Sequence, residues 1–240
     1  MFDLVIRNGT VIDGTGNPGR VADVAVSEGR IVAVGEVTEP GENEIDAAGL
    51  IVAPGFVDVH THFDAQVFWD TTLSPSPLHG VTTVISGNCG FTIAPLEAEH
   101  GEYMMEMLAR VEGMPLTSLQ EGVPWNWRTF GEYLDAIDGT LMPNAGFLVG
   151  HSALRRTVMG ERSVGEFASE DELQSMKELL AESISAGGLG FSSSWAKTHN
   201  DADGEAVPSR HASENELIEL CSVLRDSDAV ALEFIPTIER

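Results

Sequence analysis

The chain has 240 residues, enough for one large domain or two modest ones, and 42% of its residues are hydrophobic. No apolar run approaches the ~18 residues that suggest a membrane-spanning helix. The N-terminal stretch MFDLVIRNG lacks the charged-then-apolar pattern of a secretory signal. The formal net charge of −25 argues against binding to nucleic acid or to anionic membranes.

The chain contains two cysteines, too few for a disulfide scaffold, which favours a reducing cytoplasmic location. Cys221 lies in the helical apolar pattern ELIELCSVL and is predicted to be an ordinary core residue. Cys89 lies beside glycines in SGNCGF, directly after a β-rich run. This setting suits a ligand better than a packed thiol, and a buried structural thiol is the alternative.

Residues 1–54 are predicted to form short strands and turns without a helix. The stretch DLVIRNGTVID carries an Asn-Gly hairpin signal at residues 8–9. The stretch VADVAVSEGRIVAVG alternates on both sides of Glu28-Gly29, and NEIDAAGLIVAPG adds two further short runs. The segment therefore indicates a small antiparallel β unit.

From residue 55 onward the pattern changes to strands that alternate with helices. Strands are predicted in GFVDVHTH, VTTVISGNCG, NAGFLVGHSAL, GLGFSSSW and AVALEFIP. Helices are predicted at 97–114, 127–139, 169–187 and 213–228. The last two begin with Ser-x-x-Glu capping boxes at Ser169 and Ser213. Such alternation is typical of a parallel sheet with helices packed on it.

Five βα units suit part of a (β/α)8 barrel of the TIM type, which takes about 250 residues when complete. Residues 55–240 supply about five of its strands. We therefore predict an α/β chain that holds a partial barrel and is the N-terminal portion of a longer protein or one half of a split one. A complete open sheet of five strands is the alternative.

Two histidines end the first strand of this predicted barrel. Residues i and i+2 of a strand project from the same face, so His60 and His62 are expected to point together at the C-terminal mouth, where barrels carry their active sites. Cys89 ends the second strand and faces the same mouth. Two imidazoles and a thiolate suit a zinc-type ion, or two ions bridged by sulfur. Hydrogen-bonded core histidines are the alternative.

Several stretches resemble the amidohydrolase superfamily and, within it, the N-acyl-D-amino-acid deacylase (D-aminoacylase) family. They are LVIRNGTVIDGTG, DAAGLIVAPGFVDVHTHFD, GVTTVISGNCGFTIAP, GFLVGHSALR and GGLGFSSSW, and together they extend over nearly the whole chain. The resemblance implies that residues 1–54 are the N-terminal part of a flanking β-sandwich and residues 55–240 the first part of the barrel. It also implies Zn2+, as one or two ions, with His60, His62 and Cys89 as ligands.

The resemblance also bears on the remaining candidate residues. Dihydropyrimidinase-type relatives bridge their metals with a carboxylated Lys on strand four. The corresponding stretch GLGFSSSW contains no Lys. This absence agrees with the resemblance, which implies that Cys89 takes the place of that Lys. The family places a metal-binding His at the end of strand five, whereas ALEFIPTIER has none, with Phe234 in its place. Glu233 is the nearest substitute ligand, and a polar strand-end residue is the alternative.

Two further histidines are weighed separately. His151 ends strand three. It is expected either to contact the substrate or to contact a residue that binds the metal, and a structural hydrogen bond is the alternative. His199 lies in the loop after strand four, where substrate contact and solvent exposure are equally expected.

The predicted function is hydrolysis of a linear amide of small N-acylated D-amino acids by metal-activated water. The resemblance places the general base, an Asp, on strand eight, so no base is assigned within this sequence. One alternative is a cyclic-amide hydrolase or a dipeptidase on the same barrel. Another is an inactive half-barrel that needs a C-terminal half or a partner chain.

Overall fold

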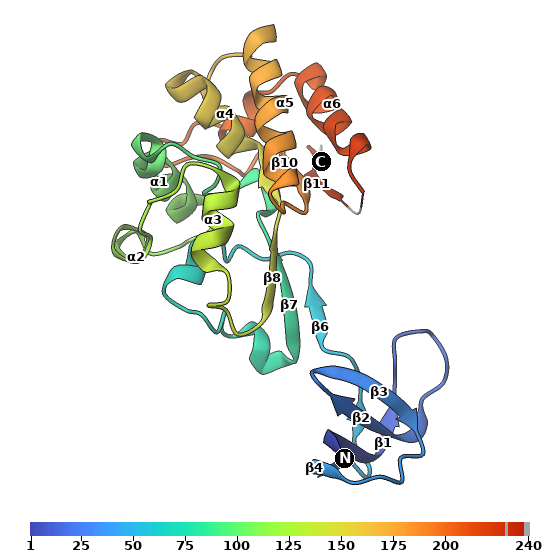
Figure 1. Ribbon diagram of the computed structural model, residues 1–240. Coiled ribbons are helices and arrows are strands. Elements are labelled where there is room, and N and C mark those ends of the chain that lie inside the picture. The colour runs from blue at the N-terminus through green and yellow to red at the C-terminus, as the bar shows by residue number, and fades with distance from the viewer. Residues whose placement is uncertain (229, 238–240) are drawn as a thin grey trace. The chain divides into compact units, whose positions relative to one another are not determined.

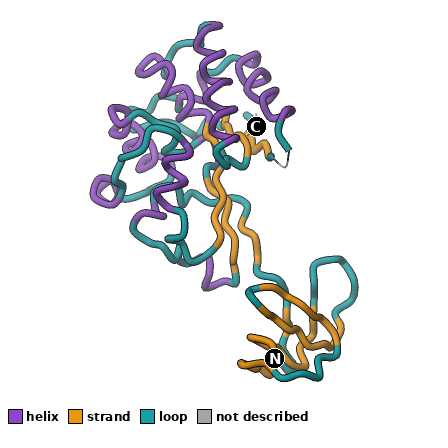
Figure 2. The backbone as a smooth tube through the Cα atoms, viewed as in Figure 1, coloured by secondary structure: helices purple, strands orange, loops and turns teal. Residues whose placement is uncertain are grey.

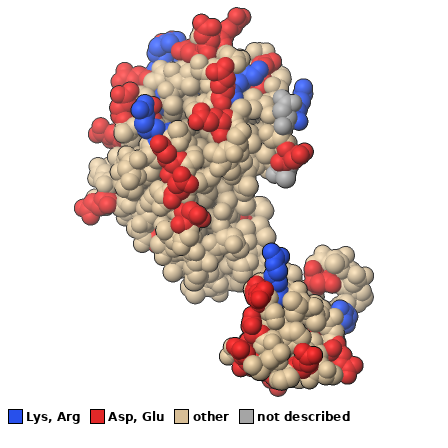
Figure 3. All heavy atoms as spheres, in the orientation of Figure 1, with Lys and Arg blue, Asp and Glu red and all other residues tan. Residues whose placement is uncertain are grey.

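The computed structural model describes residues 1–228 and 230–237 of the chain. These residues divide into two compact units, Met1–Phe56 and the described residues from Val57 onward. The first unit is built from strands and loops, and the helices lie in the second (Figure 2). No helix within the described part is long and apolar enough to cross a membrane. Acidic side chains are spread over the visible surface of each unit (Figure 3).

The first unit is one sheet in the order β3-β2-β1-β4, with β5 also paired to β1. Its strands are β1 (Phe2–Val11), β2 (Arg20–Ser27), β3 (Arg30–Gly35), β4 (Gly41–Asp46) and β5 (Ile51–Val52). The pairs β1–β2 and β2–β3 are antiparallel, but β4 and β5 run parallel to β1. The prediction of an antiparallel unit is therefore wrong for these two strands, because the chain crosses from one edge of the sheet to the far side of β1.

The Asn-Gly signal at residues 8–9 does not produce a hairpin. β1 continues through it, Asn8 has φ 61°, and the register with β2 shifts between Ile6 and Gly9. A β-bulge and a hairpin turn both favour positive φ, so the dipeptide alone does not distinguish them. Glu28-Gly29 does form the predicted two-residue turn, with φ values of 51° and 70°.

In the second unit, successive strands along the chain are neighbours in the sheets. One sheet contains β6 (Phe56–Asp58), β7 (Val81–Ser86) and β8 (Asn144–Phe147), and another contains β9 (Val149–Gly150), β10 (Gly190–Ser194) and β11 (Ala231–Ile235). Only Leu148 separates β8 from β9, and its N–H donates to Ser86 O at 2.9 Å, so the two sheets meet along one segment (Figure 1). The pairs β7–β8, β9–β10 and β10–β11 are parallel, which confirms the predicted α/β character.

The helices of the second unit are α1 (Gly101–Val111), α2 (Leu116–Gly122), α3 (Phe130–Ile137), α4 (His151–Met159), α5 (Glu170–Ser185) and α6 (Glu214–Val223). The capping box predicted at Ser169 is present. Ser213 accepts from the N–H of Glu216, but the Glu216 side chain turns into the core, so the second half of that box is missing. α2 and α4 are additional to the predicted helices, and the predicted start of strand five at residue 229 lies outside the described residues.

One large hydrophobic core lies between these strands and helices. Its fully buried members include Val84, Phe91, Phe130, Tyr133, Val149, Leu180 and Phe191. Burying a large apolar side chain stabilises the folded state by about 1.5–3 kcal/mol. The core therefore holds the strand ends, and the loops that follow them, in fixed positions.

Candidate metal centre

Three donor atoms converge just beyond the C-terminal ends of β6 and β7. Cys89 Sγ lies 3.4 Å from His60 Nε2 and 3.8 Å from His62 Nε2, and all three atoms lie within 4.8 Å of one another. Tetrahedral zinc, with bonds of ~2.3 Å to sulfur and ~2.0 Å to nitrogen, separates those two ligand atoms by about 3.5 Å. Both the spacing and the donor types fit a zinc ion.

The segment that carries His60 and His62 lies just past the strand, since β6 ends at Asp58. The predicted alternation is nevertheless kept, because Thr61 points to the opposite, buried side. Its N–H donates to Ile85 O at 3.0 Å, and its Oγ1 lies 2.8 Å from Ser86 Oγ. These bonds to β7 fix the segment so that both imidazoles face Cys89.

Cys89 lies on a sharp turn directly after β7. The 3-10 turn Asn88–Gly90 has positive φ at Cys89 (59°) and Gly90 (80°), and Gly87 before it has φ 79°. Glycine adopts such angles without steric cost, whereas other residues rarely do. Two hydrogen bonds connect this turn to Ser192 of β10. The Oγ of Ser192 accepts from Gly90 N–H at 2.9 Å and donates to the carbonyl oxygen of Gly87.

Gly87→Ala is expected to lower the free energy of unfolding by more than about 2 kcal/mol. A Cβ at Gly87 would lie 2.3 Å from the backbone oxygen of Leu148, in addition to the cost of a side chain at positive φ. Gly113→Ala is the control, because Gly113 has φ 68° but a Cβ there meets no atom within 4 Å. Urea unfolding of both variants measures the difference. Equal losses would contradict the close packing of this turn.

The ionisable groups of the centre are poorly solvated. Burial, and then the negative charge of Glu233, raises the pKa of the Cys89 thiol. Burial, and then the neighbouring His60, lowers the pKa of His62 to about 4. Without a metal the thiol is therefore protonated and His62 is neutral at pH 7, so binding of zinc through the thiolate releases a proton.

Two carboxyl groups that the sequence pattern does not single out adjoin the centre. Glu112, the residue after α1, places Oε2 3.5 Å from His62 Nε2, and burial raises its pKa to about 7. Asp64 is 3% exposed and accepts from Gly87 N–H at 3.1 Å, and burial raises its pKa to about 7. Asp64 belongs to the same motif as the histidines, whereas nothing in the local sequence marks Glu112.

β11 brings Glu233 next to the centre. Glu233 pairs with Ser192 in the register of β10 and β11, and its Oε2 accepts from the N–H of Cys89 at 2.7 Å. Burial raises the pKa of this carboxyl. Glu233 therefore contacts the backbone of a candidate ligand, and its own role as a ligand stays a prediction.

His151 is not brought to the open part of the centre. It begins α4 and is fully buried, with Nδ1 2.8 Å from Ser193 Oγ and Nε2 2.9 Å from Glu216 Oε1. Both ring nitrogens are occupied, so the geometry favours the structural hydrogen bond over direct contact with a substrate.

His199 lies at the margin of the centre. Its Nδ1 is 2.8 Å from Ser194 Oγ, and its ring centroid lies 5.0 Å from that of Phe91, which in turn lies 6.4 Å from the His62 ring. The side chain is partly buried rather than solvent-exposed. Its contact with a substrate stays a prediction.

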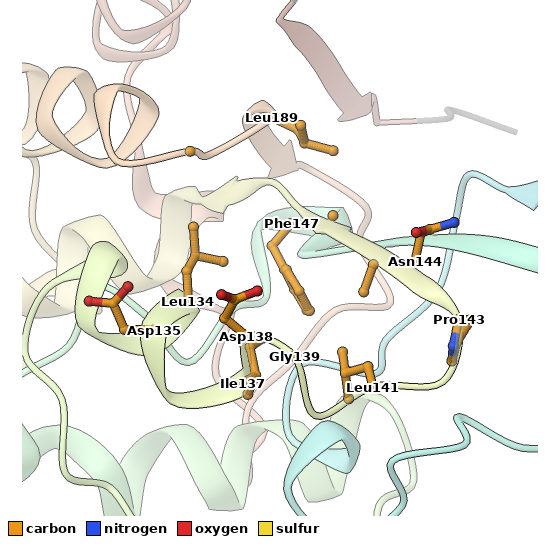
Figure 4. A pocket seen from close by; sticks show the side chains of 13 residues that line it. Leu134, Asp135, Ile137, Asp138, Gly139, Leu141, Pro143, Asn144, Phe147 and Leu189 are labelled. Atoms are coloured by element: carbon orange, nitrogen blue, oxygen red, sulfur yellow. The ribbon is translucent and has the colours of Figure 1, made fainter. Parts of the chain in front are cut away.

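A separate hollow of about 510 Å³ lies between the C-terminal end of α3, β8 and the segment before β10 (Figure 4). Its lining includes Leu134, Asp138, Asn144, Phe147 and Leu189. It shares no residue with the centre and is lined by neither histidine nor cysteine. The convergence of donor atoms, and not this hollow, is therefore the candidate functional site.

Residues 43–237 match the sequence profile described as Amidohydrolase family, and this range includes His60, His62 and Cys89. The chain belongs to the amidohydrolase family. Its relatives in this family include the D-aminoacylase of Alcaligenes xylosoxydans xylosoxydans, which is 36% identical over 225 residues, or 93% of this chain and 42% of that protein. The N-acyl-D-aspartate deacylase of the same organism is also 36% identical, over 93% of this chain and 41% of its own length.

Solved structures of amidohydrolases agree with these relatives. A crystal structure of D-aminoacylase superposes with a TM-score of 0.75 at 37% identity and covers 94% of this chain and 44% of that one. The N-acyl-D-glutamate deacylase of Bordetella bronchiseptica, complexed with zinc and a phosphonate inhibitor, superposes with a TM-score of 0.75 at 33% identity. This match covers 94% of this chain and 43% of that one. These findings confirm the resemblance to D-aminoacylases. The chain spans less than half the length of each of these four relatives.

Proposed function

We propose that this chain carries the zinc-binding part of an enzyme that hydrolyses the amide bond of N-acyl-D-amino acids. The convergence of the donor atoms of His60, His62 and Cys89 carries the proposal. The names of the similar proteins support the substrate class, and one D-aminoacylase structure is described by its binuclear metal center. One or two zinc ions are therefore proposed for this centre.

We infer that the second unit is the first part of a (β/α)8 barrel and that the first unit belongs to a flanking β-sandwich. Neighbouring strands follow chain order, and β7 pairs parallel with β8 as β10 does with β9 and β11, which supports the barrel. The D-aminoacylase structure with a TM-score of 0.75 supports it as well. The resemblance places the general base on strand eight, so no residue of the described strands is proposed as the base.

The residues of this chain have separate parts in the proposed reaction. His60, His62 and Cys89 would hold the ion, and three protein ligands leave a position for substrate or water. When bound, zinc polarises the scissile carbonyl and lowers the pKa of bound water toward ~7. Thr61 and Ser192 fix the two ligand-bearing loops to neighbouring strands, so the donors are arranged before an ion arrives. Fully buried Phe91 lies beside His62, with 6.4 Å between the ring centroids.

A substrate comparison tests this proposal. The zinc-loaded protein with a complete barrel is expected to release free amino acid from N-acetyl-D-amino acids and to leave their L-enantiomers, hydantoins and dipeptides largely intact. Removal of zinc by a chelator should abolish the release, and added zinc should restore it. Preferential hydrolysis of hydantoins or dipeptides would contradict the proposed substrate class in favour of the corresponding alternative.

A further inference from the structure

His199 lies on the same side of β10 as the candidate metal centre. Ser192 and Ser194 are two residues apart in this strand, so their side chains project from the same face. Ser192 is hydrogen-bonded to the turn that carries Cys89. Ser194 is the last residue of β10, and its Oγ lies 2.8 Å from Nδ1 of His199. His199 is therefore held next to the centre, at the C-terminal ends of the strands.

Two further observations place His199 close to the candidate ligand His62. The ring of Phe91 contacts both imidazoles, with its centroid 5.0 Å from that of His199 and 6.4 Å from that of His62. Three causes lower the pKa of His62, and they are burial, the neighbouring His60 and His199. A group that binds one end of a small molecule at the centre therefore has His199 within reach of the other end.

The hydrogen bonds of Ser194 determine which nitrogen of His199 carries the proton. The Ser194 hydroxyl is fully buried, and its oxygen accepts from the N–H of Ala196 at 3.1 Å. Among the described residues, only Nδ1 of His199 is placed to accept its hydrogen. If Nδ1 donated instead, that hydrogen would be buried without an acceptor, which is costly. Burial, and then the charge of Arg210, lowers the pKa of His199, so the neutral ring carries its proton on Nε2.

The Nε2–H group of His199 is an available donor in a setting that favours an anion. Within residues 1–228 and 230–237 it has no hydrogen-bond partner, and it is not sealed from solvent. Arg210 Nη1 donates to the carbonyl oxygen of His199 at 3.0 Å, and Arg210 forms no ion pair with a described carboxylate. The carboxylate of Asp201, in the same loop, instead accepts from Tyr103 and from backbone N–H groups. A donor beside such a cation suits a carboxylate ligand.

We propose that His199 donates a hydrogen bond from Nε2 to the carboxylate of the N-acyl amino acid and thereby selects substrates in which this carboxylate is free. The carboxylate of such a substrate is only a few bonds from the amide carbonyl, so it stays near the centre when the amide is bound there. The contact adds no ligand to the ion and leaves the position for water or substrate open. The inference rests on the proposed function, because it requires an N-acyl amino acid as the substrate.

A comparison of two substrates tests the assignment in the zinc-loaded protein with a complete barrel. The substrates are the N-acetyl-D-amino acid that the wild type hydrolyses fastest and its carboxamide, which lacks the negative charge. His199→Ala is expected to lower kcat/KM for the acid by about 10–100-fold, mainly through KM, because hydrogen bonds to charged groups are the stronger ones. It should lower kcat/KM for the carboxamide far less. His199→Gln, which keeps an N–H donor near the position of Nε2, should recover part of the loss.

His211→Ala is the matched control, because His211 lies in the same loop but its Nε2 is already 3.0 Å from the carbonyl oxygen of Ala206. It should leave the preference for the acid unchanged, and both alanine variants should keep the zinc content of the wild type. Nitrogen-15 NMR of the imidazoles adds a readout that does not depend on turnover. The signals lost in His199→Ala should be those of a ring protonated at Nε2 and unprotonated at Nδ1.

Three results would overturn the assignment of His199. They are equal losses for the acid and the carboxamide, loss of zinc in His199→Ala, and a ring proton on Nδ1. A wild-type protein that binds zinc but releases no amino acid from any N-acyl amino acid would instead overturn the proposed function, and this inference with it.

Discussion

Cys89→Ala is expected to reduce zinc affinity by about 100-fold or more, because it removes the soft, negatively charged donor of the centre. Cys89 Sγ is the atom on which both imidazoles converge, at 3.4 and 3.8 Å. Alanine and cysteine tolerate the positive φ at this position similarly, so the substitution should change the ligand set without changing the turn. Metal analysis after equilibrium dialysis against a chelator measures the loss.

Cys221→Ala is the matched control for this variant. Cys221 is also a free cysteine, but it lies partly buried in α6 and packs against the core. Its replacement should leave the zinc content at the wild-type level. Wild-type zinc content in Cys89→Ala would contradict the assignment of the thiol as a ligand, whereas loss in both variants would indicate a general effect on folding.

Arg155→Met is expected to lower the free energy of unfolding by about 3–5 kcal/mol, the usual cost of removing one partner of a buried ion pair. Arg155 is fully buried, and its Nη1 donates to both carboxylate oxygens of Glu216 at 2.6 Å. Burial favours a raised pKa for Glu216, but its bonds to His151 and Arg155 together hold the pKa below its usual value. Methionine would therefore leave a charged, buried carboxylate without its cation.

Arg162→Met is the control for the buried pair. Arg162 is 52% exposed and pairs with Glu166 and Glu172, so its loss should cost no more than about 1 kcal/mol. Adding Glu216→Gln to Arg155→Met should recover part of the loss, because the orphaned charge is then removed. Urea unfolding measures all three variants. Equal costs for Arg155→Met and Arg162→Met would contradict the account of this network.

Most of the strands and helices of the second unit, though not α2 and α4, were predictable because they depend on local patterns. The β-branched run VTTVIS marks β7, and the capping residue Ser169 marks the start of α5. The pairing in the first unit was not predictable in the same way. Strand direction in β4 and β5 depends on where the chain crosses the sheet, and Asn8-Gly9 suits a bulge as well as a turn.

The site shows the same division. The i, i+2 spacing of His60 and His62 at the end of one strand places both on the same face. Cys89 ends the next strand along the chain. The sequence therefore predicts that the three side chains lie together, as the structure shows. Glu112 reaches His62 only through the path of the connection between β7 and β8, which no periodicity encodes. Glu216 looks like a helix-capping residue in the sequence, but packing turns its side chain toward Arg155 and His151.

X-ray absorption at the zinc edge of the zinc-loaded protein tests the central claim most directly, because it reports the ligand atoms. The account predicts one sulfur at ~2.3 Å together with nitrogen and oxygen ligands at ~2.0–2.2 Å. The sulfur contribution should disappear in Cys89→Ala and persist in Cys221→Ala. Zinc surrounded only by nitrogen and oxygen in the wild-type protein would contradict a centre built on His60, His62 and Cys89.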